Sequence, residues 1–182
     1  MTSLKNIKNK IFSIAELKKE VQKWKKNNDK IVFTNGCFDI LHLGHIELLA
    51  KAADLGNKLI IAVNSDASIK FLKGEKRPIL DEKSRSIIIA SLEKVNAVII
   101  FKESTPLDVI KKINPDIIVK GGDYIKEDVI GKNYIEKYGG EVIIFPLSEG
   151  FSTTSILEKT HFRISTYWKI LGDDRCMPAG AF

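Results

Sequence analysis

The sequence has little of what marks a secreted, membrane-spanning or nucleic-acid-binding protein. Its two cysteines, Cys37 and Cys176, form neither a disulfide framework nor a metal-binding pattern. No apolar run approaches the roughly 20 residues that span a bilayer, and the first residues hold no apolar segment of signal-peptide length. The basic residues are not interleaved with aromatic ones, as on a nucleic-acid-binding surface. We therefore expect a cytoplasmic protein with no membrane partner and no nucleic-acid partner.

Two common phosphate-binding motifs are absent as well. The glycine fingerprint G-x-G-x-x-G, which marks many dehydrogenases, does not occur, and neither does the Walker A motif of P-loop kinases. What remains is an ordinary soluble composition over 182 residues, with 44% hydrophobic and 29% charged residues. That length fits one domain with a full core. The net charge of +6 suits an anionic substrate, although solvation alone explains many of the lysines.

The most informative stretch runs from residue 31 to residue 45. Four apolar or β-branched residues at 31–34 are typical of a strand that is buried on both faces. Gly36 allows a tight turn, and His42 and His45 lie three residues apart, so that they share one face of the helix that follows. Imidazoles beside the free N–H groups of a helix start are suited to bind an anion. We interpret Cys37 as a small residue that fills the turn rather than as a reactive thiol.

Five short apolar segments alternate with helical patterns along the chain. This alternation predicts an α/β fold of Rossmann-like type, an open parallel five-stranded sheet with helices on both faces. Gly56 is predicted to follow the helix at 43–55 as its C′ residue, and Ile46, Leu49, Ala50 and Ala53 are expected on the inner face of that helix. The expected strands are 31–34, 59–63, 98–101, 116–120 and 142–145, and the expected helices are 15–26, 43–55, 81–92, 106–113 and 130–138.

The chain divides into three parts. Residues 1–29 are polar and rich in lysine, and we expect them to form a helical extension whose apolar stripe packs on the main domain. Ser13 and Glu16 have the spacing of a capping box at the start of its helix. Residues 30–159 hold the alternating pattern and form the main domain. Residues 160–182 are a C-terminal extension of unknown role.

Polar clusters follow four of the expected strands at their carboxyl ends. They lie at 35–45, 64–66, 121–124 and 150–155. In open parallel sheets, ligands bind beyond the carboxyl ends of the strands, where the strand order reverses. The four clusters therefore predict one ligand site at this edge of the sheet.

These clusters resemble the marks of a known family. Asn35-Gly36-Cys37-Phe38-Asp39 and the following His42-Leu43-Gly44-His45, together with the late Ser152-Thr153-Thr154 turn, resemble the cytidylyltransferase-like nucleotidyltransferases. That family carries H-x-G-H after its first strand and a serine- and threonine-rich turn at the start of a late helix. Further segments look like the adenylyltransferase of ADP-heptose synthesis in its stand-alone form, and they lie at 33–39, 63–66, 72–74, 77–78, 119–124 and 152–154. The resemblance runs from about residue 13 to residue 159.

The resemblance implies a reaction. AMP is transferred from ATP to D-glycero-β-D-manno-heptose 1-phosphate, which gives pyrophosphate and the ADP-heptose used for lipopolysaccharide core synthesis. Mg²⁺ is expected on the ATP phosphates rather than on dedicated protein ligands, and a homodimer is expected because related enzymes often form one. The alternative is a nucleotidyltransferase that uses CTP and glycerol 3-phosphate or another phosphorylated acceptor. Leu147 speaks against glycerol 3-phosphate, because the cytidylyltransferase for that substrate has an arginine at the matching position.

The resemblance also assigns residues. As catalytic residues, His42 and His45 donate to phosphate oxygens, Lys73 closes over the triphosphate, and Arg85 reaches the leaving phosphates. The residues that bind the acceptor are Asp39, which contacts hydroxyls or orients the metal, and Asn64, Lys76 and Arg77, with Lys76 as the rival of Lys73 for the triphosphate. The nucleotide-binding residues are Asn35, Gly36, Cys37, Phe38, Gly44, Lys120, Gly121, Gly122, Asp123, Tyr124, Ser152, Thr153 and Thr154.

Each of these residues also has an ordinary structural explanation. Asp39 is suited to cap the following helix, Arg85 to face solvent on a surface helix, and the lysines to solvate the surface. The histidines would need a third ligand to hold a metal, and no Cys, His or carboxylate is convincingly placed for it. A binding protein on the same fold, without phosphate chemistry, is a further alternative, and the combination of histidines, lysine loop and Ser-Thr-Thr turn speaks against it.

Overall fold

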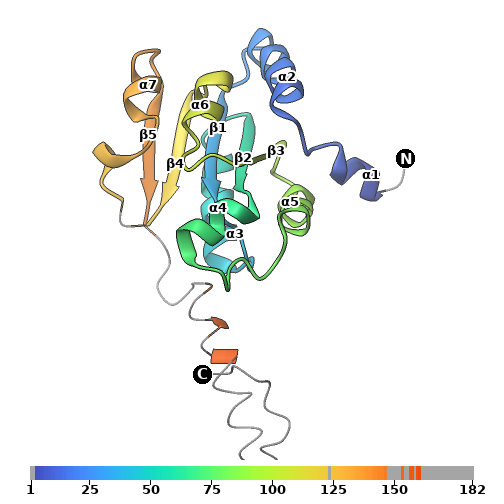
Figure 1. Ribbon diagram of the computed structural model, residues 1–182. Helices are drawn as coiled ribbons and strands as arrows, with labels where there is room; N and C mark the ends of the chain where they lie inside the picture. Colours follow the sequence, from blue (N-terminus) through green and yellow to red (C-terminus); the bar gives the residue numbers. More distant parts are fainter. Residues whose placement is uncertain (1–2, 123, 147–152, 154–155, 158, 161–182) are drawn as a thin grey trace, which may run out of the picture.

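The computed structural model describes residues 3–122, 124–146, 153, 156–157 and 159–160. Its centre is a five-stranded sheet in the order β3-β2-β1-β4-β5, in which every pairing is parallel (Figure 1). The strands are β1 (Ile31–Gly36), β2 (Lys58–Asn64), β3 (Ala97–Phe101), β4 (Ile117–Gly121) and β5 (Glu141–Phe145). The helices are α1 (Ser3–Lys8), α2 (Ile14–Lys26), α3 (Leu43–Ala53), α4 (Asp66–Lys73), α5 (Glu82–Ser91), α6 (Leu107–Ile113), the 3₁₀ helix η1 (Lys126–Asp128) and α7 (Lys132–Glu136). The predicted α/β fold with a parallel five-stranded sheet is confirmed.

The strand order reverses next to β1. The chain adds β2 and β3 on one side of β1, and it then crosses back to add β4 and β5 on the other side. The carboxyl ends of β1 and β4 therefore lie at the point where successive crossovers diverge. This is the place at which open α/β sheets bind ligands.

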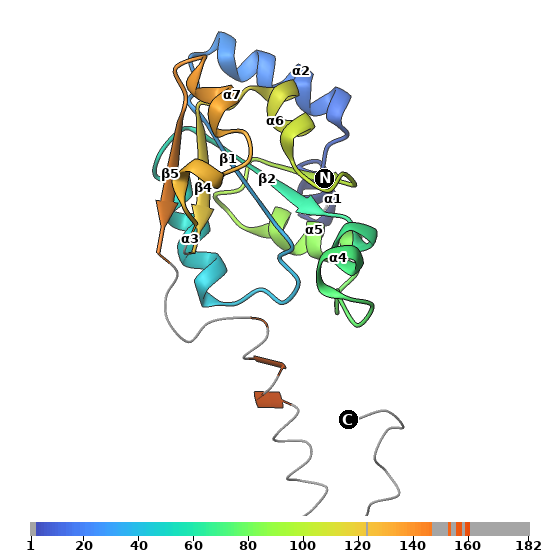
Figure 2. The same ribbon diagram turned by 60° about the vertical axis from the view of Figure 1, so that its left-hand side comes forward.

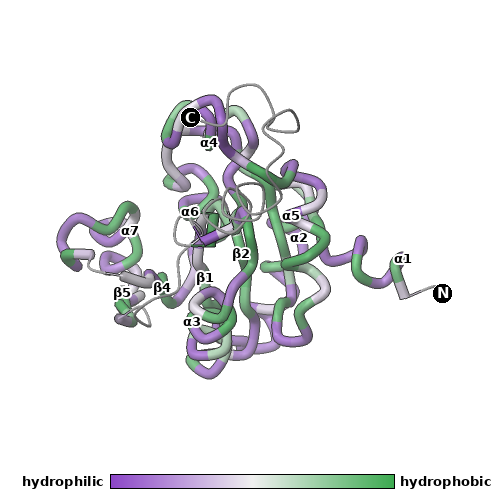
Figure 3. Tube along the Cα trace, turned by 90° about the horizontal axis from the view of Figure 1, so that it is seen from below, coloured by the Kyte–Doolittle hydropathy of each residue, from purple (hydrophilic) through white to green (hydrophobic). Residues whose placement is uncertain are grey.

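Both faces of the sheet are buried because successive side chains of a strand point to opposite sides. Ile31 and Phe33 of β1 pack in one apolar cluster with residues of α2, α6 and α7. Val32 packs in a second cluster with residues of α3 and α5. The two views in Figures 1 and 2 show these helices on either side of the sheet, and Figure 3 shows β2 as hydrophobic along most of its length. The continuous apolar runs of the strands reflect this double burial.

The helix α2 belongs to the same core. Its N-cap Ser13 and Glu16 form the capping box that their spacing predicts. Leu17, Val21 and Trp24 are buried in the cluster that includes β1, and α2 lies beside α6. The short α1 was not expected from the sequence, and it contacts α5. Among the described helices, none has both the length and the apolar character that a membrane span requires.

The prediction for Gly56 was wrong. A C′ glycine adopts a left-handed conformation, but α3 ends at Ala53 and Gly56 is not among the residues with positive φ. A Cβ atom at Gly56 would lie 2.7 Å from the carbonyl oxygen of Lys30. The glycine is thus needed for the close approach of two backbone segments and not for the end of a helix.

The buried face of α3 is also rotated from the expected one. Leu49 and Ala52 are buried as the inner face, whereas Ile46 and Ala50 are exposed. In the first turn the buried residue is Gly44, which brings the helix backbone close to its neighbours. The apolar spacing alone did not fix this rotation, because alanine and isoleucine are tolerated on an exposed face.

Candidate functional site

A cavity of about 510 Å³ opens at the carboxyl ends of β1, β2, β3 and β4. This is the edge of the sheet at which the polar clusters predict a ligand site. Ten of the predicted residues line the cavity, namely Asn35, Gly36, Cys37, Phe38, His45, Asn64, Lys73, Lys120, Gly121 and Tyr124. Six further lining residues were not singled out from the sequence, namely Thr34, Leu48, Leu72, Phe101, Ser104 and Pro106. Phe101 is the last residue of β3, and Ser104 and Pro106 follow it. The rule that ligands bind beyond strand ends could have found this segment, although the polar clusters did not mark it.

The two histidines form a stacked pair at the start of α3. His42 is the N-cap residue of the helix, and its side chain makes no capping hydrogen bond. His45 lies in the first turn, and the two ring centroids are 3.8 Å apart. The ring of Phe38 lies 5.3 Å from that of His45 and tilts against it. The stacking confirms that the H-x-G-H spacing places both imidazoles on one face.

Burial keeps both histidines neutral at pH 7. It lowers the pKa of His42 below the ordinary value of 6.5. Burial, then the neighbouring His42 and then Lys73 lower the pKa of His45 to about 4. A neutral imidazole carries one N–H donor and one acceptor nitrogen. For His45, a hydrogen bond with the backbone of Ile40 opposes the lowering of its pKa. The backbone N–H groups in the first turn of α3 lie beside these donors.

Lys120, near the end of β4, places a positive charge at the wall of the cavity. Its ammonium donates to the side-chain oxygen of Asn35 and lies 5.6 Å from the ring centroid of Tyr124. Burial lowers its pKa from 10.5 to about 8, and the Cys37 thiol opposes this shift. Lys120 is therefore mostly charged at pH 7 and loses its charge within a unit or so above it.

Lys73 and Lys76, at the end of α4 and just after it, differ in their relation to the cavity. Lys73, the last residue of that helix, lines the cavity and is close enough to His45 to lower its pKa. Lys76 is exposed and is not among the lining residues. Gly74 between them has a φ of 90°, which glycine adopts readily, and it ends the helix there.

Asp39 and Arg77 do not face the cavity as the acceptor contacts expected from the sequence. They bind each other, with 2.7 Å between Arg77 Nε and a carboxylate oxygen of Asp39. Asp39 is 2% exposed and also accepts hydrogen bonds from the N–H groups of Ile79 and Leu80. Burial raises the pKa of Asp39, but the hydrogen bonds from Leu80, Ile79 and Arg77 outweigh it and lower the pKa below 3.8. The carboxylate thus holds the loop before α5, which explains why it is not free for a sugar hydroxyl or a metal.

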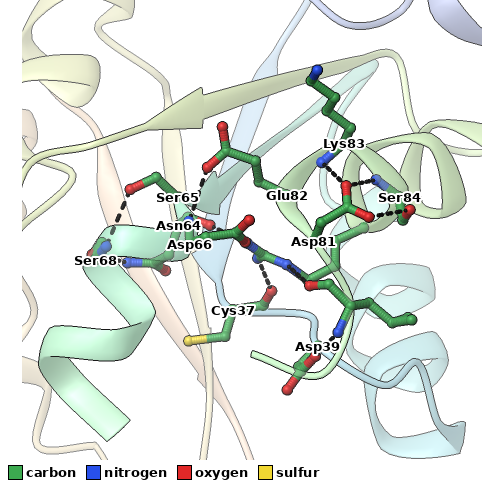
Figure 4. A network of polar contacts seen from close by, with 12 residues as sticks. Cys37, Asp39, Asn64, Ser65, Asp66, Ser68, Asp81, Glu82, Lys83 and Ser84 are labelled. Atoms are coloured by element: carbon green, nitrogen blue, oxygen red, sulfur yellow. Dashed lines mark hydrogen bonds and ion pairs between the residues drawn. The ribbon is translucent and has the colours of Figure 1, made fainter. Parts of the chain in front are cut away.

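Arg85 also differs from the expectation of a phosphate contact. Its side chain is 0% exposed, which is at odds both with a surface position and with a direct contact to a ligand. The guanidinium donates to the carbonyl groups of Leu80, Cys37 and Asn64 and to the carboxylate of Asp66. Of these partners, Cys37 lies in the turn after β1, whereas Asn64 and Asp66 lie at the junction of β2 and α4, and all three are labelled in Figure 4. All of these contacts are with protein groups.

Of the remaining predicted residues, some lie at or near the cavity and others lie outside the described part of the chain. Asn64 lines the cavity, and its side-chain amide donates to the Ser68 hydroxyl. Gly44 is buried in α3, and Gly122 follows β4 with a φ of 115°. Thr153 is helical and half-buried. Asp123, Ser152 and Thr154 lie outside the described residues, as do Leu147 and residues 161–182.

A metal would find few protein ligands here. In the described part of the chain, no three His, Cys, Asp or Glu side chains gather in a way that would hold a metal ion. Asp39, three residues before His42, is already engaged by Arg77 and by backbone N–H groups. These residues fit a Mg²⁺ ion that arrives on a phosphate ligand better than one held by a protein cage.

Comparison with known proteins identifies relatives over most of the chain. Residues 33–159 match the cytidylyltransferase-like family. The bifunctional protein HldE of Koribacter versatilis is 47% identical over 152 residues, which are 84% of this chain and 31% of that protein. The bifunctional protein HldE of Geobacter metallireducens is 47% identical over 150 residues, which are 82% of this chain and 31% of that protein. The chain therefore spans about a third of the length of these curated relatives.

Solved structures agree with this assignment. The lipopolysaccharide core biosynthesis protein from Thermoplasma volcanium is 32% identical with a TM-score of 0.54, and the match covers 66% of this chain and 97% of that chain. Pantoate-beta-alanine ligase from Francisella tularensis, complexed with beta-gamma ATP and beta-alanine, has a TM-score of 0.57 at 16% identity, covering 90% of this chain and 79% of that chain. At that identity the second likeness concerns the fold alone.

Proposed function

The chain belongs to the cytidylyltransferase-like family of nucleotidyltransferases, and from this premise we propose that it transfers AMP from ATP to a sugar 1-phosphate. The acceptor we propose is D-glycero-β-D-manno-heptose 1-phosphate, and the products are ADP-heptose and pyrophosphate. The observation that carries the proposal is the cavity at the strand ends, which is lined by His45, Lys73 and Lys120, with the ring of His42 stacked on that of His45 outside the lining. The resemblance of segments 33–39, 119–124 and 152–154 supplies the choice of ATP and of heptose.

The relatives support the acceptor class. The Thermoplasma volcanium protein is described as a lipopolysaccharide core biosynthesis protein, and ADP-heptose is the heptose donor that such synthesis needs. The HldE proteins are 47% identical to this chain over more than four fifths of its length. Those proteins are about three times as long as this chain. We therefore propose, as a separate point, that this chain is active by itself.

The reaction we propose is an in-line displacement at the α-phosphorus of ATP. An oxygen of the sugar phosphate attacks, the bond from the α-phosphorus to the bridging oxygen breaks, and pyrophosphate leaves with that oxygen. A sugar phosphate is already ionised at neutral pH, so the step needs no general base. The protein then contributes mainly by positioning the reactants and by stabilising negative charge.

We propose that the two histidines stabilise the negative charge that builds up on the phosphate oxygens during the reaction. His42 and His45 are neutral at pH 7, so each donates one N–H hydrogen bond and neither needs to give up a proton. The N-terminus of α3 adds backbone N–H groups and the positive end of the helix dipole. Oxyanion donors of this type typically contribute about 10²–10³ in rate each.

The two lysines are assigned to opposite sides of the nucleotide. Lys73, at the end of α4, would neutralise the triphosphate, while Lys120 and Tyr124 would contact the base and ribose. Ser152, Thr153 and Thr154 are proposed to hold the β- and γ-phosphates, as the resemblance implies. Mg²⁺ bound to the ATP phosphates would supply charge neutralisation at the leaving group. The resemblance also favours a cytoplasmic protein that forms a homodimer. Analytical ultracentrifugation of the whole chain tests the dimer.

The test is a panel of nucleotides and acceptors with pyrophosphate release as the readout. ATP and CTP are each combined with D-glycero-β-D-manno-heptose 1-phosphate and with glycerol 3-phosphate in the presence of Mg²⁺. We expect the fastest release with ATP and the heptose phosphate, and no release when either is left out. Faster release with CTP and glycerol 3-phosphate would overturn the choice of substrates. Tight ATP binding without pyrophosphate release from any pair would point to a binding protein instead.

A further inference from the structure

Arg85 is the largest fully buried side chain of the described residues, and it lies outside the cavity wall. Its partners come from the turn after β1, the end of β2, the start of α4 and the loop before its own helix (Figure 4). A charge taken out of water is tolerated only where the surrounding groups satisfy it. Here Asp66 supplies the counter-charge, and three backbone carbonyls accept the remaining hydrogen bonds.

Leu80 is held from both sides by charged side chains. Its N–H donates to Asp39, and its carbonyl accepts from Arg85. Arg85 also binds the carbonyl of Cys37, two residues before Asp39. Together with the backbone from Cys37 to Asp39, these three hydrogen bonds close a ring through Asp39, Leu80, Arg85 and Cys37. Arg77 braces the ring through its ion pair with Asp39.

The ring encloses a strained residue. Phe38, between Cys37 and Asp39, has a φ of 47°, a left-handed conformation that is uncommon for a non-glycine residue. Such a conformation persists only where the surroundings determine it, and here both neighbours of Phe38 are tied to the ring. The Phe38 side chain lies against Gly36 and 5.3 Å from the His45 ring. A movement of the turn would carry the aromatic ring away from His45.

We propose that Arg85 is a positioning residue, which acts with Asp39 to lock residues 37–39 against the loop at 77–80 and so fixes the Phe38 ring that holds His45 at the cavity. The effect on turnover rests on the proposed role of His45 in nucleotidyl transfer. The effect on the His45 ring itself does not.

The test compares Arg85→Lys with Ser86→Ala. Ser86 is the next residue of α5 and is equally buried, but its hydroxyl donates only to Glu82 within the same helix. Its loss therefore removes a buried hydrogen bond without touching the ring. Histidine NMR titration gives the pKa of His45, and steady-state kinetics give kcat and the KM for ATP. Both readouts are taken on the whole chain at one temperature at which unfolding curves show each variant folded.

In Arg85→Lys, we expect the pKa of His45 to rise from about 4 toward 6.5, because a displaced Phe38 ring admits water. We also expect kcat to fall about 10- to 100-fold while the KM for ATP changes much less, as when a catalytic group is misplaced. Ser86→Ala should lower the unfolding midpoint and leave both the kcat and the pKa of His45 at wild-type values. Asp39→Asn, of nearly the same volume, opens the ring at the other side and should move both readouts in the same direction as Arg85→Lys.

The proposal fails if Arg85→Lys and Asp39→Asn leave the pKa of His45 as it is in Ser86→Ala. It also fails if neither variant folds, since the ring would then serve folding and not the placement of one side chain. Should the wild-type chain release no pyrophosphate from any substrate pair, the proposed function is at fault. The NMR titration would still decide the role of Arg85 in that case.

Discussion

Two sets of charged side chains lie at the same end of this molecule, and they differ in where their hydrogen bonds go. Lys73 and Lys120 line the cavity, and Lys120 uses one of its three ammonium donors on Asn35. Asp39 and Arg85 do not line it. Asp39 accepts hydrogen bonds from Arg77 and from the backbone N–H of Leu80. Arg85 donates to Asp66 and to the backbone carbonyls of Leu80 and Cys37.

The first set of side chains can bind a ligand, whereas the second set holds segments of the protein together. A charge whose partners are all protein groups can hold segments together, but it has nothing left for a ligand. A cation at the cavity wall with unused donors can bind a nucleotide. Charged side chains at the same end of the sheet therefore serve two purposes.

The largest effect is expected for His45→Ala. The substitution removes a cavity-facing donor while leaving the buried ring of hydrogen bonds intact, so we expect kcat to fall about 10²–10³-fold. The unfolding midpoint should stay close to that of the wild type. Ile46→Ala, an exposed position on the same helix, is the matched control and should keep kcat within about twofold. Near-normal turnover of His45→Ala would remove the histidine from the mechanism.

A smaller effect is expected for Lys73→Ala. Loss of one charge-assisted hydrogen bond costs about 1.5–3 kcal/mol, which corresponds to about 10- to 100-fold in kcat/KM for ATP. Lys70 lies one turn earlier on α4 and pairs with Glu75 at the surface, so Lys70→Ala should change kcat/KM less than about twofold. Lys76→Ala should fall between the two. Equal losses of kcat/KM in the three variants would mean that nucleotide binding depends on the net charge of this region and not on a contact at the cavity wall.

A pH effect is expected from Lys120. Its pKa of about 8 means that its charge is lost as the pH rises through that value. We expect kcat/KM for ATP to decrease above about pH 8 in the wild type. In Lys120→Arg the guanidinium stays charged, so the decrease should move to much higher pH even if the activity at pH 7 is lower. A decrease that remains at pH 8 in Lys120→Arg would assign it to another group.

The smallest effect concerns stability in acid. Because hydrogen bonds lower the pKa of Asp39 below 3.8, its ionised form stabilises the native state above that pH. This contribution is lost as the pH falls through the lowered value. Urea unfolding between pH 5 and pH 2 should therefore show a steeper loss of the free energy of unfolding in the wild type than in Asp39→Asn. Parallel curves would mean that the carboxylate does not build the loop.

Much of this arrangement was predictable from the sequence, because it depends on local signals. The apolar runs marked the strands, their carboxyl ends marked the site, and the three-residue spacing of His42 and His45 placed both rings on one helix face. Ser13 and Glu16 likewise marked the start of α2. Each of these signals acts within a few residues, so no tertiary contact was needed to read it.

The roles of the buried charges were not predictable in the same way. Asp39 and Arg77 are 38 residues apart, and Arg85 and Cys37 are 48 residues apart. Nothing local tells whether an arginine on a helix faces a ligand, the solvent or three carbonyl groups of other segments. The rotation of α3 and the close approach at Gly56 depend on neighbouring segments too, which is why these two predictions failed.

The central claim is that the chain joins the AMP unit of ATP to a sugar 1-phosphate, and labelled ATP tests it most directly. The whole chain is incubated with Mg²⁺, D-glycero-β-D-manno-heptose 1-phosphate and ATP labelled at either the α- or the γ-phosphate. We expect the α-label to appear in a sugar nucleotide and the γ-label in pyrophosphate. A γ-label in the sugar product, or both labels still in ATP after prolonged incubation, would contradict it.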